Sequence, residues 1–349
     1  MLKLASLLEG SMKAITTLGP SPEHPEGHLQ DTSVSFPPLP GPHDLRVRVE
    51  AVAVNPVDLK VRGTLAPGGP PQVLGWDGAG VVEATGDAVQ RFRRGDAVMF
   101  AGSINRPGCQ AESVLVDARL AGRKPTNFSF AEAAALPLTG LTAWESLFER
   151  LGLDPEGGDR GRTLLILGGA GGVGSMAIQL ARRAELRVIA SASREESQAW
   201  VQQLGAEWVV DHNLPIGPQL DALGLDTVDA IANFHDTDYY WELMAERIQP
   251  QGGIVALVSS KGDLDLNLLK SKSVRFCWEY MFTRSQFQTP DMEEQGRILD
   301  FLASAAEGGS LVTTARTFMA PICAATLNQA YRLLQEGHSL GKIVLSGWG

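Results

Sequence analysis

The stretch that most constrains the fold runs from Leu164 to Arg182 and reads LLILGGAGGVGSMAIQLAR. An apolar run typical of a buried strand leads into glycines spaced as GxGxxG, and an apolar-striped helix follows directly. Such glycines allow a tight turn and let the backbone approach a pyrophosphate, whose charge the helix N-terminus stabilises. The alternative is a merely structural glycine turn. The expected dinucleotide-binding residues are Gly169, Ala170, Gly171, Gly172, Val173 and Gly174.

The end of the next strand predicts which dinucleotide is bound. An acidic residue at this point would hydrogen-bond the 2′-hydroxyl of NAD. Here the strand 187–192 is followed by Ser193 and Arg194, and no acidic residue occurs before Glu195. A hydroxyl and a guanidinium suit the 2′-phosphate of NADP, so we expect both side chains to bind NADPH. In the alternative interpretation, Ser193 only caps the next helix and Arg194 is solvated.

Strands and helices alternate around this turn. The region from about 12 to 135 has short alternating strand patterns, whereas near-continuous apolar strands separated by helices follow. That second pattern indicates a parallel sheet covered on both faces, which is a doubly wound fold. The expected strands are 163–167, 187–192, 208–210, 228–232, 254–258 and 342–345, and the expected helices are 129–136, 139–151, 173–183, 195–204, 292–306 and 324–336.

Composition excludes several classes of protein. The length of 349 residues suggests about two domains. Thirty Lys and Arg against 40 Asp and Glu give a formal charge of −10, which argues against a nucleic-acid partner. No apolar run reaches the roughly 18 residues that a membrane span needs. The cysteines, Cys109, Cys277 and Cys323, form neither a disulfide framework nor a metal pair, as expected for a cytoplasmic protein.

A series of motifs in a fixed order resembles the medium-chain dehydrogenase/reductase family, in its zinc-free quinone oxidoreductase branch. The motifs are Asn55-Pro56-Val57-Asp58, Gly75-Trp76-Asp77-Gly78-Ala79-Gly80-Val81-Val82, Gly95-Asp96-Ala97-Val98, the turn 170–174 and Gly341-Lys342-Ile343-Val344-Leu345. The stretch 278–284 resembles a subgroup often labelled zinc-type alcohol dehydrogenase-like. Ordered motifs over most of the chain are far more specific than any one of them.

The resemblance implies an α/β protein with a GroES-like β-rich catalytic domain and a Rossmann cofactor domain built on a doubly wound parallel sheet. The expected catalytic domain comprises 12–136 and a return segment, 286–349, and the expected NADP-binding domain comprises 137–285. We interpret residues 1–11 as a leader or tag, because they lack a secretory pattern and end just before Met12.

The same resemblance argues against catalytic zinc. Asn55 stands where zinc-dependent members carry their first cysteine ligand, and Trp76 stands where they carry a histidine. No cysteine lies between 136 and 142, where a third ligand would fall. Catalytic zinc needs three protein ligands, usually Cys and His, so we expect no zinc.

The resemblance also suggests catalytic residues, each with a structural alternative. Asn55 is expected to orient substrate or nicotinamide, or else to be a turn residue before Pro56. Trp76 is expected to line the substrate pocket, or else to be a core residue. Thr139 is expected to meet the nicotinamide, or else to cap a helix. We expect Asp58 to hold the local fold, and no residue is assigned as proton donor.

Two further cofactor contacts follow from the resemblance. Lys342 matches a position that reaches the pyrophosphate, and the alternative is a surface lysine. His212 falls where relatives place a residue near the adenosine phosphate.

The expected function is an NADPH-dependent, zinc-independent oxidoreductase that transfers hydride to a quinone or another conjugated carbonyl compound. The alternatives are a reductase of alkenals, enones or simple carbonyls, and a non-catalytic NADPH-binding structural protein. The segment 273–278 has the alternation of an edge strand, from which we expect a homodimer.

Overall fold

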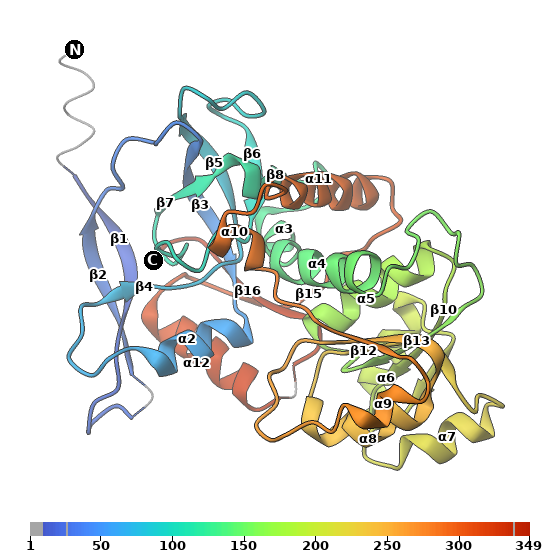
Figure 1. The fold of residues 1–349 in the computed structure, drawn as a ribbon. Helices are drawn as coiled ribbons and strands as arrows, with labels where there is room; N and C mark the ends of the chain where they lie inside the picture. The colour runs from blue at the N-terminus through green and yellow to red at the C-terminus, as the bar shows by residue number, and fades with distance from the viewer. Residues whose placement is uncertain (1–9, 26, 338) are drawn as a thin grey trace. The chain divides into compact units, whose positions relative to one another are not determined.

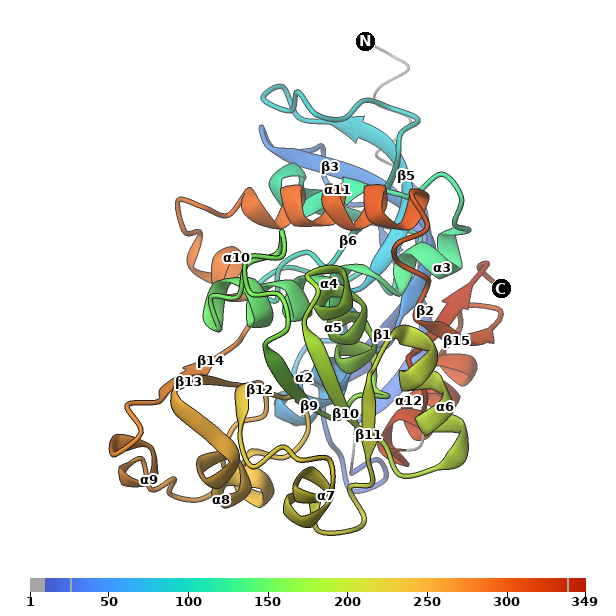
Figure 2. The ribbon, with the colours of Figure 1, turned by 90° about the vertical axis from the view of Figure 1, so that its right-hand side faces the viewer.

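The computed structural model describes residues 10–349 apart from residues 26 and 338. The described chain divides into two units (Figures 1 and 2), of which one is the contiguous segment Thr139–Met281 and the other combines the part up to Leu138 with Phe282–Gly349. The boundaries lie within a few residues of those expected at 136/137 and 285/286. Most of the expected leader, 1–11, lies outside the described residues, and the first strand already begins at Ser11.

The unit 139–281 is built on a six-stranded sheet in the order β11-β10-β9-β12-β13-β14, in which all neighbours are parallel. Its strands are β9 (Thr163–Leu167), β10 (Arg187–Ser191), β11 (Trp208–Val210), β12 (Val228–Asn233), β13 (Ile248–Ala256) and β14 (Arg275–Trp278). The strand order reverses at β9, and ligands of such sheets bind beyond the carboxyl ends of the strands at this point. The expected doubly wound parallel sheet is therefore confirmed.

Both faces of this sheet are covered. Leu165 and Leu167 pack in one apolar cluster with Met244, whereas Leu164 and Ile166 face the other side and are equally buried. The helices of this unit are α4 (Pro137–Trp144), which starts at the boundary, η2 (Glu145–Arg150), α5 (Gly172–Arg183), α6 (Glu195–Leu204), α7 (Ile216–Ala222), α8 (Thr237–Arg247) and α9 (Asn267–Lys270). Among the residues described, no helix is long and apolar enough to cross a bilayer.

The expected helix 139–151 is only half α-helical, because η2 is a π-helical segment. Glu145 at its start is fully buried, and Arg150 at its end places its Nε 2.8 Å from a carboxylate oxygen of the buried Glu279. Burial and the neighbouring Glu145 raise the pKa of Glu279. A cluster of two acids and one arginine therefore accompanies the π-helical segment. The local sequence does not predict this cluster, because Glu279 is distant in the chain.

The other unit contains a seven-stranded sheet in the order β15-β16-β3-β5-β6-β8, with β7 also paired to β3. These strands are β3 (Asp44–Ala53), β5 (Gly78–Thr85), β6 (Ala97–Phe100), β7 (Ser113–Asp117), β8 (Ala121–Arg123), β15 (Ala315–Met319) and β16 (Lys342–Ser346). A three-stranded sheet comprises β1 (Ser11–Leu18), β2 (His28–Ser35) and β4 (Gln72–Val73). The helices are α2 (Pro56–Thr64), η1 (Ala118–Leu120), α3 (Phe130–Ala134), α10 (Thr283–Phe287), α11 (Glu294–Glu307) and α12 (Ala324–Gln335). The last strand, β16, runs antiparallel to β3 and so completes a sheet begun near the N-terminus.

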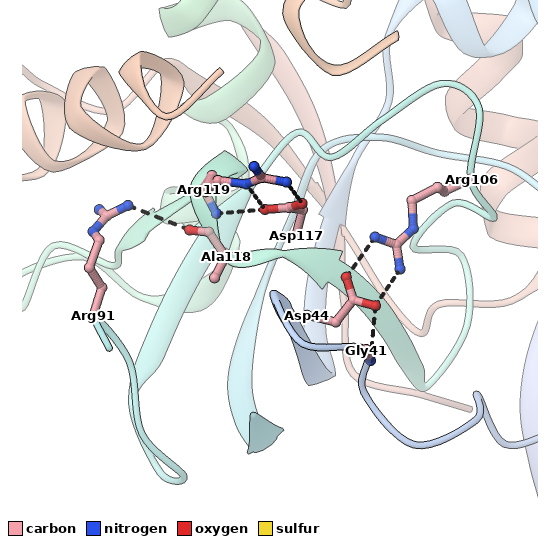
Figure 3. Close-up of polar contacts among 7 residues, drawn as sticks. All are labelled: Gly41, Asp44, Arg91, Arg106, Asp117, Ala118 and Arg119. Atoms are coloured by element: carbon pink, nitrogen blue, oxygen red, sulfur yellow. Dashed lines mark hydrogen bonds and ion pairs between the residues drawn. The ribbon is translucent and has the colours of Figure 1, made fainter. Parts of the chain in front are cut away.

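Two arginine forks hold the pair β3 and β7 where its acidic ends meet (Figure 3). Asp44 and Asp117 are register partners, and like charges directly opposite each other destabilise a strand pair. Arg106 donates two hydrogen bonds to Asp44, at 2.8 and 3.1 Å, and Arg119 donates to both oxygens of Asp117. Each carboxylate therefore has its own cation, and Arg106 also fixes the loop that precedes β7.

Candidate active site and cofactor turn

The glycine turn after β9 has the geometry that its sequence predicts. Backbone conformation requires glycine at one position of the turn, and packing requires it at another. Gly168 has a φ of +83°, and its N–H donates to Ser191 Oγ at 2.9 Å. A Cβ at Gly174 would lie 2.2 Å from the carbonyl oxygen of Gly168. Neither position tolerates a larger side chain without movement of the backbone.

Gly171 differs from these two glycines because the protein itself leaves space beside it. It is the N-cap of α5 with extended backbone, and the nearest atom to a Cβ there would be the Gly168 carbonyl oxygen at 3.5 Å, an ordinary contact. None of the described side chains caps the first turn of α5. The free N–H groups of the first turn of this 12-residue helix follow directly after Gly171. A glycine at this position leaves room for a phosphate to approach those N–H groups.

Basic residues follow three strands at the carboxyl edge of this sheet. Arg194 comes after β10, His212 after β11 and His235 after β12. Arg194, rather than Ser193, is the N-cap of α6, and its backbone N–H donates to Ser197 Oγ at 3.0 Å. Ser193 therefore does not serve as the cap that the structural alternative supposed.

The two histidines lie close together. Their ring centroids are 6.5 Å apart with an interplanar angle of 23°. Burial, His235 and Arg194 together lower the pKa of His212. The protonated form of His212 is therefore disfavoured, and a bound anion would favour it. Sequence reasoning missed His235. Its position two residues after an apolar strand could have indicated it, because ligands of doubly wound sheets bind at that edge.

Asn55 and Lys342 are brought together in the other unit, in a buried polar network. Asn55 is the N-cap of α2, and Lys342 begins β16. The Lys342 ammonium donates to the Val54 carbonyl oxygen at 2.8 Å, to Asn55 Oδ1, and to Asp77 Oδ2 at 2.9 Å. All three N–H groups of the ammonium are thereby used, and its expected contact with a pyrophosphate remains a prediction.

Asp77 is the counter-ion of this lysine. Its Oδ2 also accepts a hydrogen bond from Asn55 Nδ2 at 3.1 Å, and its Oδ1 accepts one from the Leu138 N–H at 3.1 Å. Burial raises the pKa of Asp77, and the charge and hydrogen bond of Lys342 oppose that rise. The two partners fix the Asn55 amide in one orientation, with its oxygen toward the ammonium and its nitrogen toward the carboxylate.

Asp58 is a second buried carboxyl at the start of α2. Its Oδ2 accepts the backbone N–H of Asn55 at 2.9 Å, whereas its Oδ1 has no hydrogen-bond partner in the described part of the chain. Burial raises the pKa of Asp58 to about 7. The Asp58–Asn55 bond holds the beginning of α2, in line with the fold-holding role expected for Asp58.

Trp76 is buried next to Asp77, with its ring edge-on to Phe282 at a centroid distance of 6.2 Å. Its indole N–H has no acceptor among the residues described. The cavity that it lines has a volume of about 20 Å³, room for about one water molecule. Thr139 is buried in α4 and belongs to the unit 139–281, so the structure groups it with the cofactor turn rather than with Asn55 and Trp76.

Comparison with known proteins places both units in one family. Residues 41–141 match the alcohol dehydrogenase GroES-like domain, and residues 172–294 match the zinc-binding dehydrogenase domain. A zinc-type alcohol dehydrogenase-like protein of Staphylococcus epidermidis is 39% identical over 310 residues, which cover 88% of this chain and 92% of that protein. The chain belongs to the medium-chain dehydrogenase/reductase family.

Solved structures of the family agree with this assignment. One solved structure is of a Rhizobium etli CFN 42 protein described as a zinc-dependent alcohol dehydrogenase. It is 45% identical, with a TM-score of 0.92 over 97% of this chain and 99% of that one. The quinone oxidoreductase of Coxiella burnetii is 27% identical, with a TM-score of 0.77 over 97% and 99% of the two chains. The GroES-like and Rossmann-like domains expected from the sequence are therefore confirmed.

Zinc, which several of these family names imply, does not fit the residues at this site. The side chains that contact the Lys342 ammonium offer an amide oxygen from Asn55 and a carboxylate from Asp77, whereas catalytic zinc takes mainly Cys and His. The Lys342 ammonium already contacts both of these oxygens, and its positive charge opposes a dication. Throughout the described residues, no three His, Cys, Asp or Glu side chains are grouped as a metal site.

Proposed function

We propose that this dehydrogenase/reductase is an NADPH-dependent enzyme that transfers hydride to a quinone or another conjugated carbonyl acceptor without zinc. The observation that carries the proposal is the network in which Lys342 and Asp77 hold the Asn55 amide. The sequence resemblance places the first zinc ligand of zinc-dependent members at this position. Without a Lewis acid, an isolated carbonyl is poorly polarised. A conjugated acceptor needs less polarisation, because it delocalises the negative charge that it gains.

The choice of NADPH is supported by the basic residues beyond the glycine turn. Arg194 and His212 follow neighbouring strands, and the positive charge of Arg194 contributes to the low pKa of His212. A 2′-phosphate would relieve that repulsion through charge-assisted hydrogen bonds, whereas the 2′-hydroxyl of NADH would not. The space beside Gly171 and the uncapped start of α5 suit the pyrophosphate.

When bound, NADPH supplies the hydride. The chain provides orientation: Asn55 holds one amide orientation through its two charged neighbours, and is the residue proposed to position the acceptor or the nicotinamide. Trp76 contributes an apolar wall with one N–H that lacks an acceptor within the described chain. Water is the proposed proton source, which is sufficient for a quinone because the hydroquinone anion is a stable product.

The decisive experiment is oxidation of NADPH by the purified protein with an ortho-quinone, with and without EDTA, and with NADH in parallel. We expect turnover that survives EDTA and prefers NADPH. Loss of turnover with EDTA would refute the zinc-free mechanism. Binding of NADPH without turnover of quinones would move the assignment to an alkenal or enone reductase, tested with those acceptors, or to a non-catalytic NADPH-binding protein if none reacts.

A homodimer is also part of this proposal. Among the strands described, β14 pairs with β13 alone, and Trp278 at its end is 46% exposed. An edge strand with an exposed aromatic residue can extend the sheet by pairing with a second copy. Light scattering at micromolar concentration should give twice the mass of 37.3 kDa, and a monomer mass would contradict the proposal.

A further inference from the structure

The position of Lys342 is fixed by its backbone as well as by its side chain. Its N–H donates to the Thr314 carbonyl oxygen at 2.8 Å, and the next residue, Ile343, accepts the Val54 N–H at 3.1 Å. The residue just before β15 and the residue just after β3 therefore flank the lysine, and only 3% of it is exposed. An ammonium in such a place is a permanent part of the architecture rather than a mobile surface charge.

The surroundings of the ammonium resemble the oxygen shell of a bound cation. A carbonyl oxygen, an amide oxygen and a carboxylate oxygen converge on it, from Val54, Asn55 and Asp77. A charge is buried at acceptable cost only when it is paired and its hydrogen bonds are satisfied, and both conditions hold here. Removing the ammonium would leave a buried carboxylate and two dipoles directed at an empty position.

We propose that Lys342 is the built-in cation of this site, which takes the place of a metal ion, balances Asp77 and fixes the Asn55 amide. The proposal goes beyond the proposed function, because it concerns the charge that holds the site and applies whichever acceptor is reduced. Lys342 is a positioning residue in this scheme, since it acts through Asn55.

The chemistry of the shell predicts which free ion could replace the ammonium. The Val54 and Asp77 oxygens lie 2.8 and 2.9 Å from the nitrogen, distances that suit an ammonium or potassium ion. Magnesium binds oxygen at about 2.0–2.1 Å and prefers about six ligands, so it fits poorly. Lys342→Ala should therefore create a site that selects ammonium and potassium over lithium and magnesium.

The test is the melting temperature of Lys342→Ala in chloride salts of ammonium, potassium, lithium and magnesium at equal ionic strength. We expect Lys342→Ala to melt at a lower temperature than the wild type. Ammonium and potassium chloride should raise its melting temperature by about 2–4 °C, whereas lithium and magnesium chloride should not. Lys60→Ala, which removes an exposed lysine of α2, is the matched control and should show no ion preference. The double variant Lys342→Ala/Asp77→Asn should also lose the preference, because the counter-charge is gone.

A merely structural role for Lys342 would lower stability equally in every salt, and that result would overturn the proposal. A second measurement does not depend on a variant that folds: the wild type is dialysed against zinc and its metal content is then measured. We expect no retained zinc. Retention of one equivalent of zinc by the wild type would overturn the proposal. Neither readout uses turnover, so a failed quinone assay would leave this inference standing.

Discussion

His212 and His235 face each other with nearly parallel rings, although they follow strands that are separated in the sheet by β9 and β10. Their proximity, together with burial and Arg194, keeps the pKa of His212 below its ordinary value. A bound 2′-phosphate would favour the protonated form and raise that pKa, so binding of NADPH should take up protons.

The affinity for NADPH should therefore fall as the pH rises through the raised pKa of His212. We expect a loss of about two- to fivefold between about pH 6.5 and 8.5, because His212 of the free protein titrates below its ordinary value and only part of the linked proton uptake falls in this range. The phosphate itself is half protonated at about pH 6, so the test belongs above that value. Titration calorimetry with NADPH and NADH should show the effect for NADPH alone, and His212→Asn should flatten it. Equal pH dependence for both nucleotides would contradict this interpretation.

Arg194→Ala should weaken NADPH by about 1–3 kcal/mol, the usual value of a hydrogen bond to a charged group, and leave NADH nearly unchanged. Arg160→Ala removes an exposed arginine of the same unit and is the matched control, with no effect on either nucleotide expected. Dissociation constants from fluorescence titration would measure the effect. Equal losses for both nucleotides would mean that Arg194 does not contact the 2′-phosphate.

The two glycines of the cofactor turn should respond differently to valine. Gly171→Val should retain the melting temperature of the wild type, because the protein leaves space for a Cβ at this position. It should lose NADPH binding, because the side chain would fill the space that the phosphate needs. Gly174→Val should lose stability as well, by about 1–3 kcal/mol or more, since its Cβ would collide with the Gly168 carbonyl. Thermal unfolding and NADPH titration of both variants check this, and normal binding by Gly171→Val would show that the pyrophosphate lies elsewhere.

The buried carboxyl of Asp58 should make the protein less stable at neutral pH than at acidic pH. Its pKa is raised from 3.8 to about 7, so the folded state holds a proton that the unfolded state loses. Stability should fall as the pH rises from about 4 to 7, by up to about 4 kcal/mol, and change little above that range. In Asp58→Asn this dependence should be reduced, with higher stability than the wild type at pH 8. Urea unfolding at pH 5 and pH 8 measures the difference, and parallel curves for the two proteins would contradict it.

Much of the unit 139–281 could be predicted because its signals are local. The strand Thr163–Leu167 and the helix Glu195–Leu204 agree with the expected bounds to the residue, since a continuous apolar run and a helix that ends at Gly205 define them without help from distant residues. The strand expected at 254–258 instead runs from Ile248 to Ala256, and it includes Gln251, whose φ is +64°. Local pattern does not predict that irregularity.

The polar network of the other unit could be predicted only in part. Asn55 was identified from its motif, but its partners Asp77 and Lys342 lie 22 and 287 positions away in the sequence. Neither hydrophobic periodicity nor spacing indicates such a long-range pairing. The same holds for Glu145 and Glu279, whose burial together accompanies the π-helical turn.

The pairing of β16 with β3 also affects the order in which the two units can fold during synthesis. Lys342 reaches its partner Val54 across 288 positions, so the ribosome must release nearly the whole chain before Asp77 meets its cation. The unit Thr139–Met281 is contiguous and needs no later segment to complete it, so it can fold while synthesis continues. A nascent chain that stops short of β16 therefore holds a complete Rossmann-like unit, whereas the sheet of the GroES-like unit still lacks the strand that carries Lys342.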